Sequence, residues 1–259
     1  MSAVTLACDE AGAGPPLLIL HGLFGSARNW QNHARRLAER YHVLAVDQRN
    51  HGRSSHAEPH DYTTLAQDIL DLCAEHALRD VVLLGHSMGG KVAMTCALTA
   101  PDRFSKLVIV DIAPTAYADA HTPIIDAMLA LPLATLRRRQ DADTQLAAAV
   151  PERDIRLFLL QNLVLDAAGF HWRLNLPVLR AAMPALIGAL PVAPTARFDG
   201  PVHFIRGARS DRVGAAGIAA SRSHFPQLTV HTVPDAGHWP HAENPAAFGA
   251  CLDSALAEP

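Results

Sequence analysis

Short, uninterrupted apolar runs alternate along the chain with longer segments in which apolar residues recur at helical spacing. The apolar runs predict buried strands at Leu17–Leu20, Val43–Val46, Val81–Leu84, Leu107–Val110 and Val202–Ile205. A strand covered on both faces has no polar side, so its sequence lacks the alternation of a half-exposed strand. The segments between these runs predict helices at Trp30–Arg40, Thr64–Ala77 and Gly90–Leu98. This order is typical of an α/β protein with a mostly parallel, doubly wound sheet.

The pattern continues at both ends of the chain but stops in the middle. Strands are expected near Val4–Cys8 and at Leu228–Val233, and Pro245–Ala257 predicts a closing helix. Residues 115–199 are rich in alanine, leucine and proline and contain no convincing strand. We therefore predict a core of residues 1–114 and 200–259, with residues 115–199 inserted as a helical cap. A cap at the carboxyl edge of a parallel sheet lies where ligands bind; the alternative is a packing layer without a role in specificity.

Composition narrows the class of protein. Of 259 residues, 49% are apolar and 18% are charged, which allows a large core and argues against disorder. The net charge of −3 gives nucleic acid or an anionic membrane no electrostatic attraction. No apolar run approaches the ~18 residues of a spanning helix, and the N-terminus lacks the pattern of a secretion signal. We therefore expect a small-molecule substrate, and neither a nucleic acid nor a membrane as partner.

Cysteine and histidine usage gives no sign of a metal or a disulfide framework. The cysteines, Cys8, Cys73, Cys96 and Cys251, are scattered and form no C-x-x-C pair, which predicts reduced thiols in a cytoplasmic protein. Fifteen histidines are present, and His238 and His241 are three residues apart. Since no H-E-x-x-H sequence or Cys/His cluster accompanies them, we predict no metal and no cofactor.

The hexapeptide Gly85–Gly90 is the most specific signal in the chain. It places Ser87 in a G-x-S-x-G sequence between an apolar run and a predicted helix, which is the context of a nucleophile elbow. A Cβ at Gly85 or Gly89 would collide with neighbouring backbone in so tight a turn. The amide of Met88 and the start of the helix would face the same point, ready to stabilise negative charge. The alternative is a strand–glycine–helix turn with an incidental serine.

A serine hydroxyl needs a base, and His238 is the candidate. It follows the last predicted strand, in Asp235–Trp239, and we expect Gly237 to let the backbone bend so that the imidazole reaches back over the sheet. The chain order Ser…Asp…His is that of hydrolases with a nucleophile elbow.

Two aspartates compete for the acid that orients this histidine. Asp111 ends an apolar run, where burial of a carboxylate is costly unless it is paired. If the next strand lies beside the nucleophile strand, Asp111 is ~5 Å away laterally and Asp211 ~10 Å. Asp211 is flanked by Arg209 and Arg212, which can satisfy it without catalysis, so Asp111 is favoured.

An oxyanion hole requires two backbone amides, and we assign one to Met88. The second is expected from the loop His21–Gly25, with Leu23 the first choice and Phe24 the next; a plain strand-end turn is the alternative. The polar segment Asp47–Ser54 contains Arg49 and His51, and we interpret it as a hydrogen-bonded brace of this edge rather than as catalytic.

Several strings together resemble one group of the α/β-hydrolase family, the YbfF-type and ABHD11-type esterases. They are His21–Ser26, Asp47–Ser54, Gly85–Lys91, Val110–Pro114, Trp172–Pro177 and Ala236–Ala242. The resemblance implies the α/β-hydrolase fold and a serine esterase, with thioesters of the acyl-CoA kind as a further substrate class. It also implies that Asp111 is the acid and that Ser210, where many relatives carry aspartate, supports the histidine–acid pair. Asp211 follows directly, so a small loop shift would restore the usual arrangement.

The sequence thus predicts a hydrolase that cleaves carboxylic esters through an acyl-serine, with Ser87, His238 and Asp111 as its triad. Two other activities fit the same residues. One is a cofactor-free perhydrolase or acyltransferase, and the other is a hydrolase-like receptor that uses the triad to recognise a ligand. Acyl length, the choice between alcohol and CoA leaving groups, and oligomeric state stay open at this point.

Overall fold

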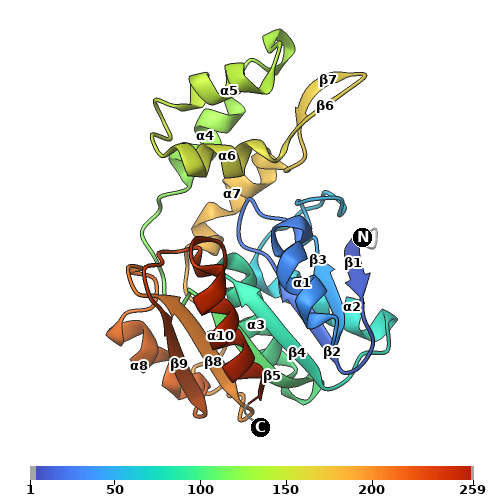
Figure 1. Ribbon diagram of the computed structural model, residues 1–259, viewed down its shortest axis with the longest axis vertical. Coiled ribbons are helices and arrows are strands. Elements are labelled where there is room, and N and C mark those ends of the chain that lie inside the picture. Colours follow the sequence, from blue (N-terminus) through green and yellow to red (C-terminus); the bar gives the residue numbers. More distant parts are fainter. Residues whose placement is uncertain (1–3, 258–259) are drawn as a thin grey trace.

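Within residues 4–257, the part of the chain that the computed structural model describes, seven strands form one sheet (Figure 1). In spatial order the strands are β1 (Cys8–Ala11), β3 (His42–Val46), β2 (Pro16–Leu20), β4 (Val81–His86), β5 (Phe104–Val110), β8 (Val202–Gly207) and β9 (Leu228–Val233). Strand β1 is antiparallel to β3, and every other neighbouring pair is parallel. The mostly parallel sheet is therefore confirmed.

Helices cover both faces of this sheet. They are α1 (Gln31–Leu37), α2 (Tyr62–Glu75), α3 (Met88–Thr99), α8 (Ala215–His224), α9 (Pro240–Glu243) and α10 (Pro245–Ala257). Along β2, Leu18 and Leu20 belong to the cluster that contains α2 and α3, whereas Leu17 and Ile19 belong to the cluster that contains α1 and α10. Because successive side chains of a strand point to opposite faces and both faces are buried, the strand reads as one apolar run.

The N-terminal strand differs from the expectation. We predicted it near Val4–Cys8, but β1 begins at Cys8 and runs along the edge of the sheet as far as Ala11. Its residues are half-buried or exposed, and Asp9 and Glu10 lie within it. An edge strand that faces water carries polar residues, so hydrophobicity could not locate it. Helix α8 also escaped prediction, since Ser221 is its one buried position and its apolar stripe is weak.

Residues between β5 and β8 form a separate layer above the carboxyl ends of the strands (Figure 1). Its elements are α4 (Thr122–Leu129), α5 (Arg139–Leu146), α6 (Arg153–Leu160), α7 (Leu176–Leu186), and the hairpin of β6 (Leu163–Asp166) and β7 (Gly169–Trp172). The expectation of a strandless insertion is therefore wrong. Each strand of the hairpin is only four residues long, and the turn between them lacks an Asn-Gly or Asp-Gly signal. Single 3₁₀ turns complete the fold at η1 (Ala27–Trp30), η2 (Pro101–Arg103) and η3 (Leu133–Thr135).

The two segments that connect this layer to the sheet run beside each other. The Tyr117 amide donates to the Ile187 carbonyl at 2.9 Å, and the Leu190 amide donates to the Pro114 carbonyl at 3.1 Å. The exit and the return of the chain therefore form one paired connection. None of the helices within residues 4–257 is long and apolar enough to cross a bilayer.

A buried lysine joins α3 to both connecting segments. The Lys91 ammonium donates to the Thr115 carbonyl at 2.9 Å and to the Gly188 carbonyl at 2.5 Å. It also lies 5.5 Å from the centre of the Tyr62 ring and 4.9 Å from that of Tyr117. Burial lowers the pKa of this lysine to about 8. The two aromatic faces and two carbonyls compensate the loss of hydration, so Lys91 fastens the layer at its base.

Candidate active site

Ser87 sits at the sharp turn between β4 and α3. Its φ of 52° lies in the left-handed region, which residues with a Cβ rarely adopt. The turn leaves no room for side chains at its glycines: a Cβ on Gly85 would lie 2.2 Å from the Gly89 carbonyl oxygen, and one on Gly89 would lie 2.4 Å from the Leu20 carbonyl oxygen. The G-x-S-x-G sequence is therefore required by the geometry that lifts the serine above the sheet.

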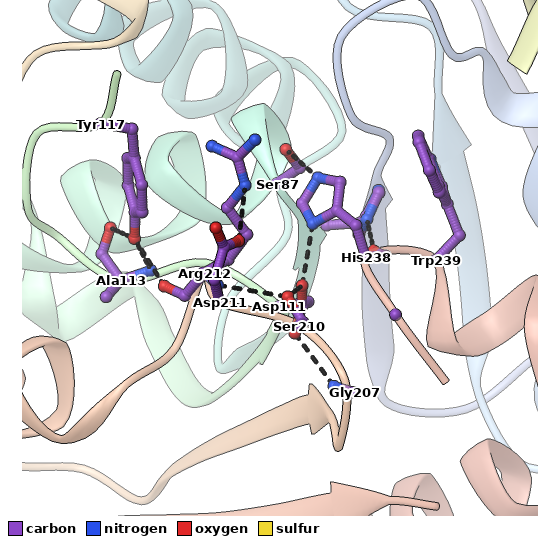
Figure 2. Close-up of polar contacts among 12 residues, drawn as sticks. Ser87, Asp111, Ala113, Tyr117, Gly207, Ser210, Asp211, Arg212, His238 and Trp239 are labelled. Atoms are coloured by element: carbon purple, nitrogen blue, oxygen red, sulfur yellow. Dashed lines mark hydrogen bonds and ion pairs between the residues drawn. The ribbon is translucent and has the colours of Figure 1, made fainter. Parts of the chain in front are cut away.

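His238 reaches Ser87 from the loop that follows β9, as predicted. With its Nδ1 protonated, His238 donates to Asp111 Oδ2 at 2.8 Å and accepts the Ser87 hydroxyl proton at Nε2, with an Nε2–Oγ distance of 3.0 Å (Figure 2). The His238 carbonyl accepts a hydrogen bond of 2.8 Å from His86 Nε2. The three predicted side chains therefore form one continuous hydrogen-bonded chain, although they are far apart in the sequence.

The bend that directs His238 toward the sheet is not where we predicted it. Asp235, not Gly237, adopts a left-handed φ, of 55°. Gly237 instead donates its amide to Glu243 Oε2 at 2.7 Å, and Trp239 donates its amide to Glu243 Oε1 at 3.0 Å. Aspartate tolerates the left-handed region because its short side chain bonds locally. The Glu243 carboxylate, on α9, therefore accepts hydrogen bonds from the amides on both sides of His238.

Asp111 is fully buried at the end of β5 and has a φ of 51°. Its Oδ1 accepts the Gly207 amide at 3.0 Å, and its Oδ2 accepts both the Ser210 hydroxyl and the His238 ring. A buried carboxylate is costly unless donors replace its water. Here an amide, a hydroxyl and an imidazole do so, and the hydroxyl is that of Ser210.

The competing aspartate lies elsewhere. The Asp211 side chain is 95% exposed, and its nearest charged partner is Arg212, with 3.6 Å between Oδ1 and Nε. Strand β5 is the immediate neighbour of β4, and β8 is one strand further away. The structure therefore brings Asp111 to His238 and leaves Asp211 in solvent.

The polar segment Asp47–Ser54 braces the loop that follows β2. His51 donates from Nδ1 to the Arg49 carbonyl at 3.0 Å, and its Nε2 accepts the Phe24 amide at 3.3 Å. Arg49 forms a bidentate ion pair with Asp68, with 2.5 Å between the nearest atoms. The Phe24 amide, our second choice for the oxyanion hole, is therefore already engaged.

The amides of Leu23 and Met88 remain free to bind a ligand. Neither of them donates to any acceptor among residues 4–257. Both residues line one small cavity together with Ser87. A Cβ on Gly22 would lie 3.2 Å from the Cβ of Ser87, so only glycine lets this loop approach so closely. Both amides are thus available beside Ser87.

A stack of neutral aromatic rings lies beneath the loop of His238, and no motif in the sequence indicates it. The His86 ring lies 5.0 Å from that of His238, and the His241 ring stacks on Trp30 at 4.4 Å. Burial lowers the pKa of His86 to about 3 and holds the pKa of His241 well below its ordinary value. These rings therefore stay uncharged and do not compete with His238 for a proton.

Two cavities adjoin Ser87. The larger, of about 310 Å³, includes His238, Ile124, Phe158 and Trp239 in its walls, so the layer above the sheet contributes apolar side chains to it. The smaller, of about 40 Å³, continues past Ser87 toward α3. A mostly apolar cavity with a few convergent polar groups is typical of a small-molecule site. Within residues 4–257 no group of three or more His, Cys, Asp or Glu side chains could hold a metal ion.

The fold and this site define a class. The model of the family described as "alpha/beta hydrolase fold" matches residues 15–245, and the chain belongs to that family. The fold and family inferred from the motifs are thereby confirmed.

Individual relatives sharpen the class. The chain is 39% identical to the sn-1-specific diacylglycerol lipase ABHD11 of Mus musculus, over 94% of this chain and 81% of that protein. It is 36% identical to esterase YbfF of Escherichia coli strain K12, over 90% of this chain and 89% of that protein. Among solved structures, a marine microorganism esterase superposes with a TM-score of 0.92 at 32% identity, covering 97% and 98% of the two chains. The chain is a carboxylic-ester hydrolase, as predicted.

Proposed function

We propose that this enzyme cleaves carboxylic esters through an acyl-serine intermediate, with Ser87 as nucleophile, His238 as base and Asp111 as orienting acid. The observation that carries the proposal is the unbroken hydrogen-bonded chain, 3.0 Å from the serine to the imidazole and 2.8 Å from the imidazole to the carboxylate. The names of the similar proteins, an esterase and a diacylglycerol lipase, support the reaction class.

The reaction begins when His238 Nε2 takes the hydroxyl proton as Ser87 Oγ attacks the acyl carbon. Negative charge then develops on the acyl oxygen, where the amides of Leu23 and Met88 stabilise it; one such donor contributes ~3 kcal/mol. His238 next gives the proton to the leaving oxygen or sulfur, and the bond from that atom to the acyl carbon breaks. Water attacks the acyl-serine by the same route and releases the acid and free Ser87.

Ser210 is a fourth member of this arrangement in the proposal. Its hydroxyl donates to the same carboxylate oxygen of Asp111 that His238 contacts, and its Oγ accepts the Arg212 amide at 3.2 Å. Because the Ser210 oxygen accepts from that amide, its hydroxyl proton points toward the Asp111 carboxylate. Ser210 thereby holds the acid in the orientation that keeps His238 in the reactive tautomer.

Replacement of the nucleophile tests the mechanism. Ser87→Ala should lower kcat for an aryl butanoate by at least about 10⁴-fold, because the base contacts no other hydroxyl within residues 4–257. A fluorophosphonate probe should add covalently to the wild type at Ser87, which peptide mass spectrometry would locate. Ser105→Ala, at an exposed position of β5, is the matched control and should keep both properties. Turnover by Ser87→Ala at the wild-type rate would contradict the mechanism.

The fate of the acyl group separates the hydrolase from its rivals. With water, ethanol and hydrogen peroxide in competition, we expect the free acid as the main product from both an ester and the matching thioester. An excess of ethyl ester or peracid would instead indicate an acyltransferase or a perhydrolase. An acyl adduct that persists on Ser87 would indicate a ligand-binding receptor.

A further inference from the structure

An arginine that the reaction does not use points into the active site. Arg212 lies on the loop after β8 and lines both cavities that open at Ser87. Its guanidinium carbon is 5.4 Å from the centre of the Tyr117 ring, and its side chain is 23% exposed. Figure 2 shows this side chain beside the Ser87 hydroxyl, on the side away from Trp239.

The charge of this arginine is poorly compensated by the protein. Within residues 4–257 its ion pair joins Nε to Asp211 Oδ1 at 3.6 Å, and the Asp211 side chain is 95% exposed, so water screens the pair. The two Nη atoms donate to no acceptor among residues 4–257. A partly buried guanidinium has five N–H donors and is most stable against a carboxylate or phosphate. The loop therefore presents unused donors to whatever binds next to Ser87.

The surroundings of Arg212 also favour an anion. Among the described residues, the walls of the smaller cavity contain the cations Arg212 and Lys91 and no aspartate or glutamate. His121 lines both cavities, and its buried Nδ1 has no partner among residues 4–257. Burial, and then the charge of Arg212, lower the pKa of His121 to about 4, so this ring is neutral and can donate one hydrogen bond. A ligand carboxylate would satisfy both groups.

The smaller cavity suits the acyl part of a substrate. Tyr62, Met183 and Leu186, all buried, line it, whereas the larger cavity, of about 310 Å³, has room for the leaving group. The leaving group must depart before water attacks, while the acyl group stays on Ser87. At about 40 Å³ the smaller cavity holds roughly three or four water-sized groups, the size of a short carboxyalkyl chain.

We propose that Arg212 is a specificity-determining residue that binds a carboxylate on the acyl group, so that the preferred substrates are monoesters or monothioesters of short dicarboxylic acids. The inference rests on the proposed function, since it assigns one part of the substrate of that same site. Such a group would reach from the acyl carbon at Ser87 to the guanidinium, with His121 as a second donor.

Two matched esters test the inference. Monoethyl glutarate carries the carboxylate, and its primary-amide isostere has the same shape without the charge. In the wild type we expect kcat/KM to be at least about tenfold higher for the monoester. Arg212→Gln should lower kcat/KM for the monoester by about 10- to 100-fold, the range for a lost charge-assisted hydrogen bond. The value for the amide should stay within about threefold.

The variant is designed to keep the loop intact. The Arg212 backbone contacts, its amide to Ser210 Oγ and its carbonyl to the Tyr117 hydroxyl, do not depend on the side chain. Arg209→Gln is the matched control on the same loop; this guanidinium donates to the Asp235 carbonyl at 2.7 Å and should leave the preference unchanged. Free glutarate should inhibit hydrolysis of the amide ester competitively, and Arg212→Gln should weaken that inhibition at least about tenfold.

The outcomes separate this inference from the proposed function. A wild type that hydrolyses the amide ester equally well or better overturns the role of Arg212 and leaves the Ser87 mechanism intact. An equal loss on both esters in Arg212→Gln would also overturn it. Hydrolysis of neither ester, together with no labelling of Ser87, would contradict the proposed function itself.

Discussion

The two sides of the active site are held in different ways. On the sheet side, Asp111 accepts three hydrogen bonds, and His238 is held at both ring nitrogens and at its carbonyl. On the opposite side, the layer of α4–α7 shares an apolar cluster with the sheet and makes scattered hydrogen bonds to it, such as those of Lys91 and the bond of 2.7 Å from the Tyr62 hydroxyl to the Leu186 carbonyl.

This difference indicates that the two sides of the site have different roles. Groups that transfer protons must be held within a fraction of an ångström, and the sheet side supplies that through short loops on buried strands. The layer above contributes cavity walls, for which apolar shape is sufficient. We therefore expect substitutions on the sheet side to change kcat, and substitutions at the base of the layer to change KM.

The acid should give the largest effect. Asp111→Asn should lower kcat by about 10⁴-fold, because an amide in this position favours the wrong tautomer of His238. Steady-state kinetics on a neutral aryl ester would measure the loss. Asp211→Asn is the matched control and should remain within about twofold of the wild type. Comparable losses in the two variants would remove the distinction between the buried and the exposed aspartate.

The lysine at the base of the layer should give the next effect. Lys91→Met leaves the carbonyls of Thr115 and Gly188 without their donor, which should cost about 2–4 kcal/mol of unfolding free energy in urea. Lys106→Met is the control, because that ammonium donates to the carbonyls of Ala255 and Leu256 far from the site. Both variants should lose stability, but only Lys91→Met should raise KM, by about five- to tenfold. A KM that moves equally in both would contradict the role of Lys91 in placing the layer.

The neutral rings beneath the site should make the protein sensitive to acid. Burial lowers the pKa of His241 well below its ordinary value of 6.5, so below that pH the unfolded chain binds a proton that the folded chain does not. Stability is then full above pH 6.5 and falls as the pH decreases, by up to ~1.4 kcal/mol per pH unit for each such histidine.

His241→Phe sharpens this test, because the ring can still stack on Trp30 and the His241 side chain makes no hydrogen bond within residues 4–257. Unfolding in urea at pH 7.5, 6 and 5 should show a shallower loss for the variant. A slope identical to that of the wild type would show that His241 does not contribute.

The hairpin of the upper layer should give the smallest effect. Leu165, on β6, is 60% exposed. Leu165→Ser should change the unfolding free energy by less than about 0.5 kcal/mol and leave kcat and KM unchanged, because no buried contact is lost. Thermal unfolding and ester kinetics would measure this. A loss above about 1 kcal/mol would show that the hairpin packs against something that its exposure does not reveal.

The accuracy of the sequence-based predictions follows the range of the interactions. Ser87 was identified because the glycines of the elbow are required by contacts within a few residues. The strand at Leu228–Val233 and the helix at Pro245–Ala257 were predicted with their observed bounds, since the strand is rich in β-branched residues and the helix buries apolar residues at helical spacing. Strand β1 was misplaced and the hairpin of β6 and β7 was missed, because short, exposed strands bear no such pattern.

The sequence by itself determined the turn that carries Ser87, the loop that carries His238, the order of the buried strands along the chain and the family. Each depends on local backbone geometry or on burial. Both restrict which residue types can occupy a position, so their effect is visible in the sequence itself. Only the tertiary structure decided whether Asp111 or Asp211 contacts His238, and whether the amide of Leu23 or that of Phe24 is left free. Those choices depend on which strand lies beside which and on which donor is already engaged. Both are contacts between residues distant in the chain, and no single segment of sequence records them.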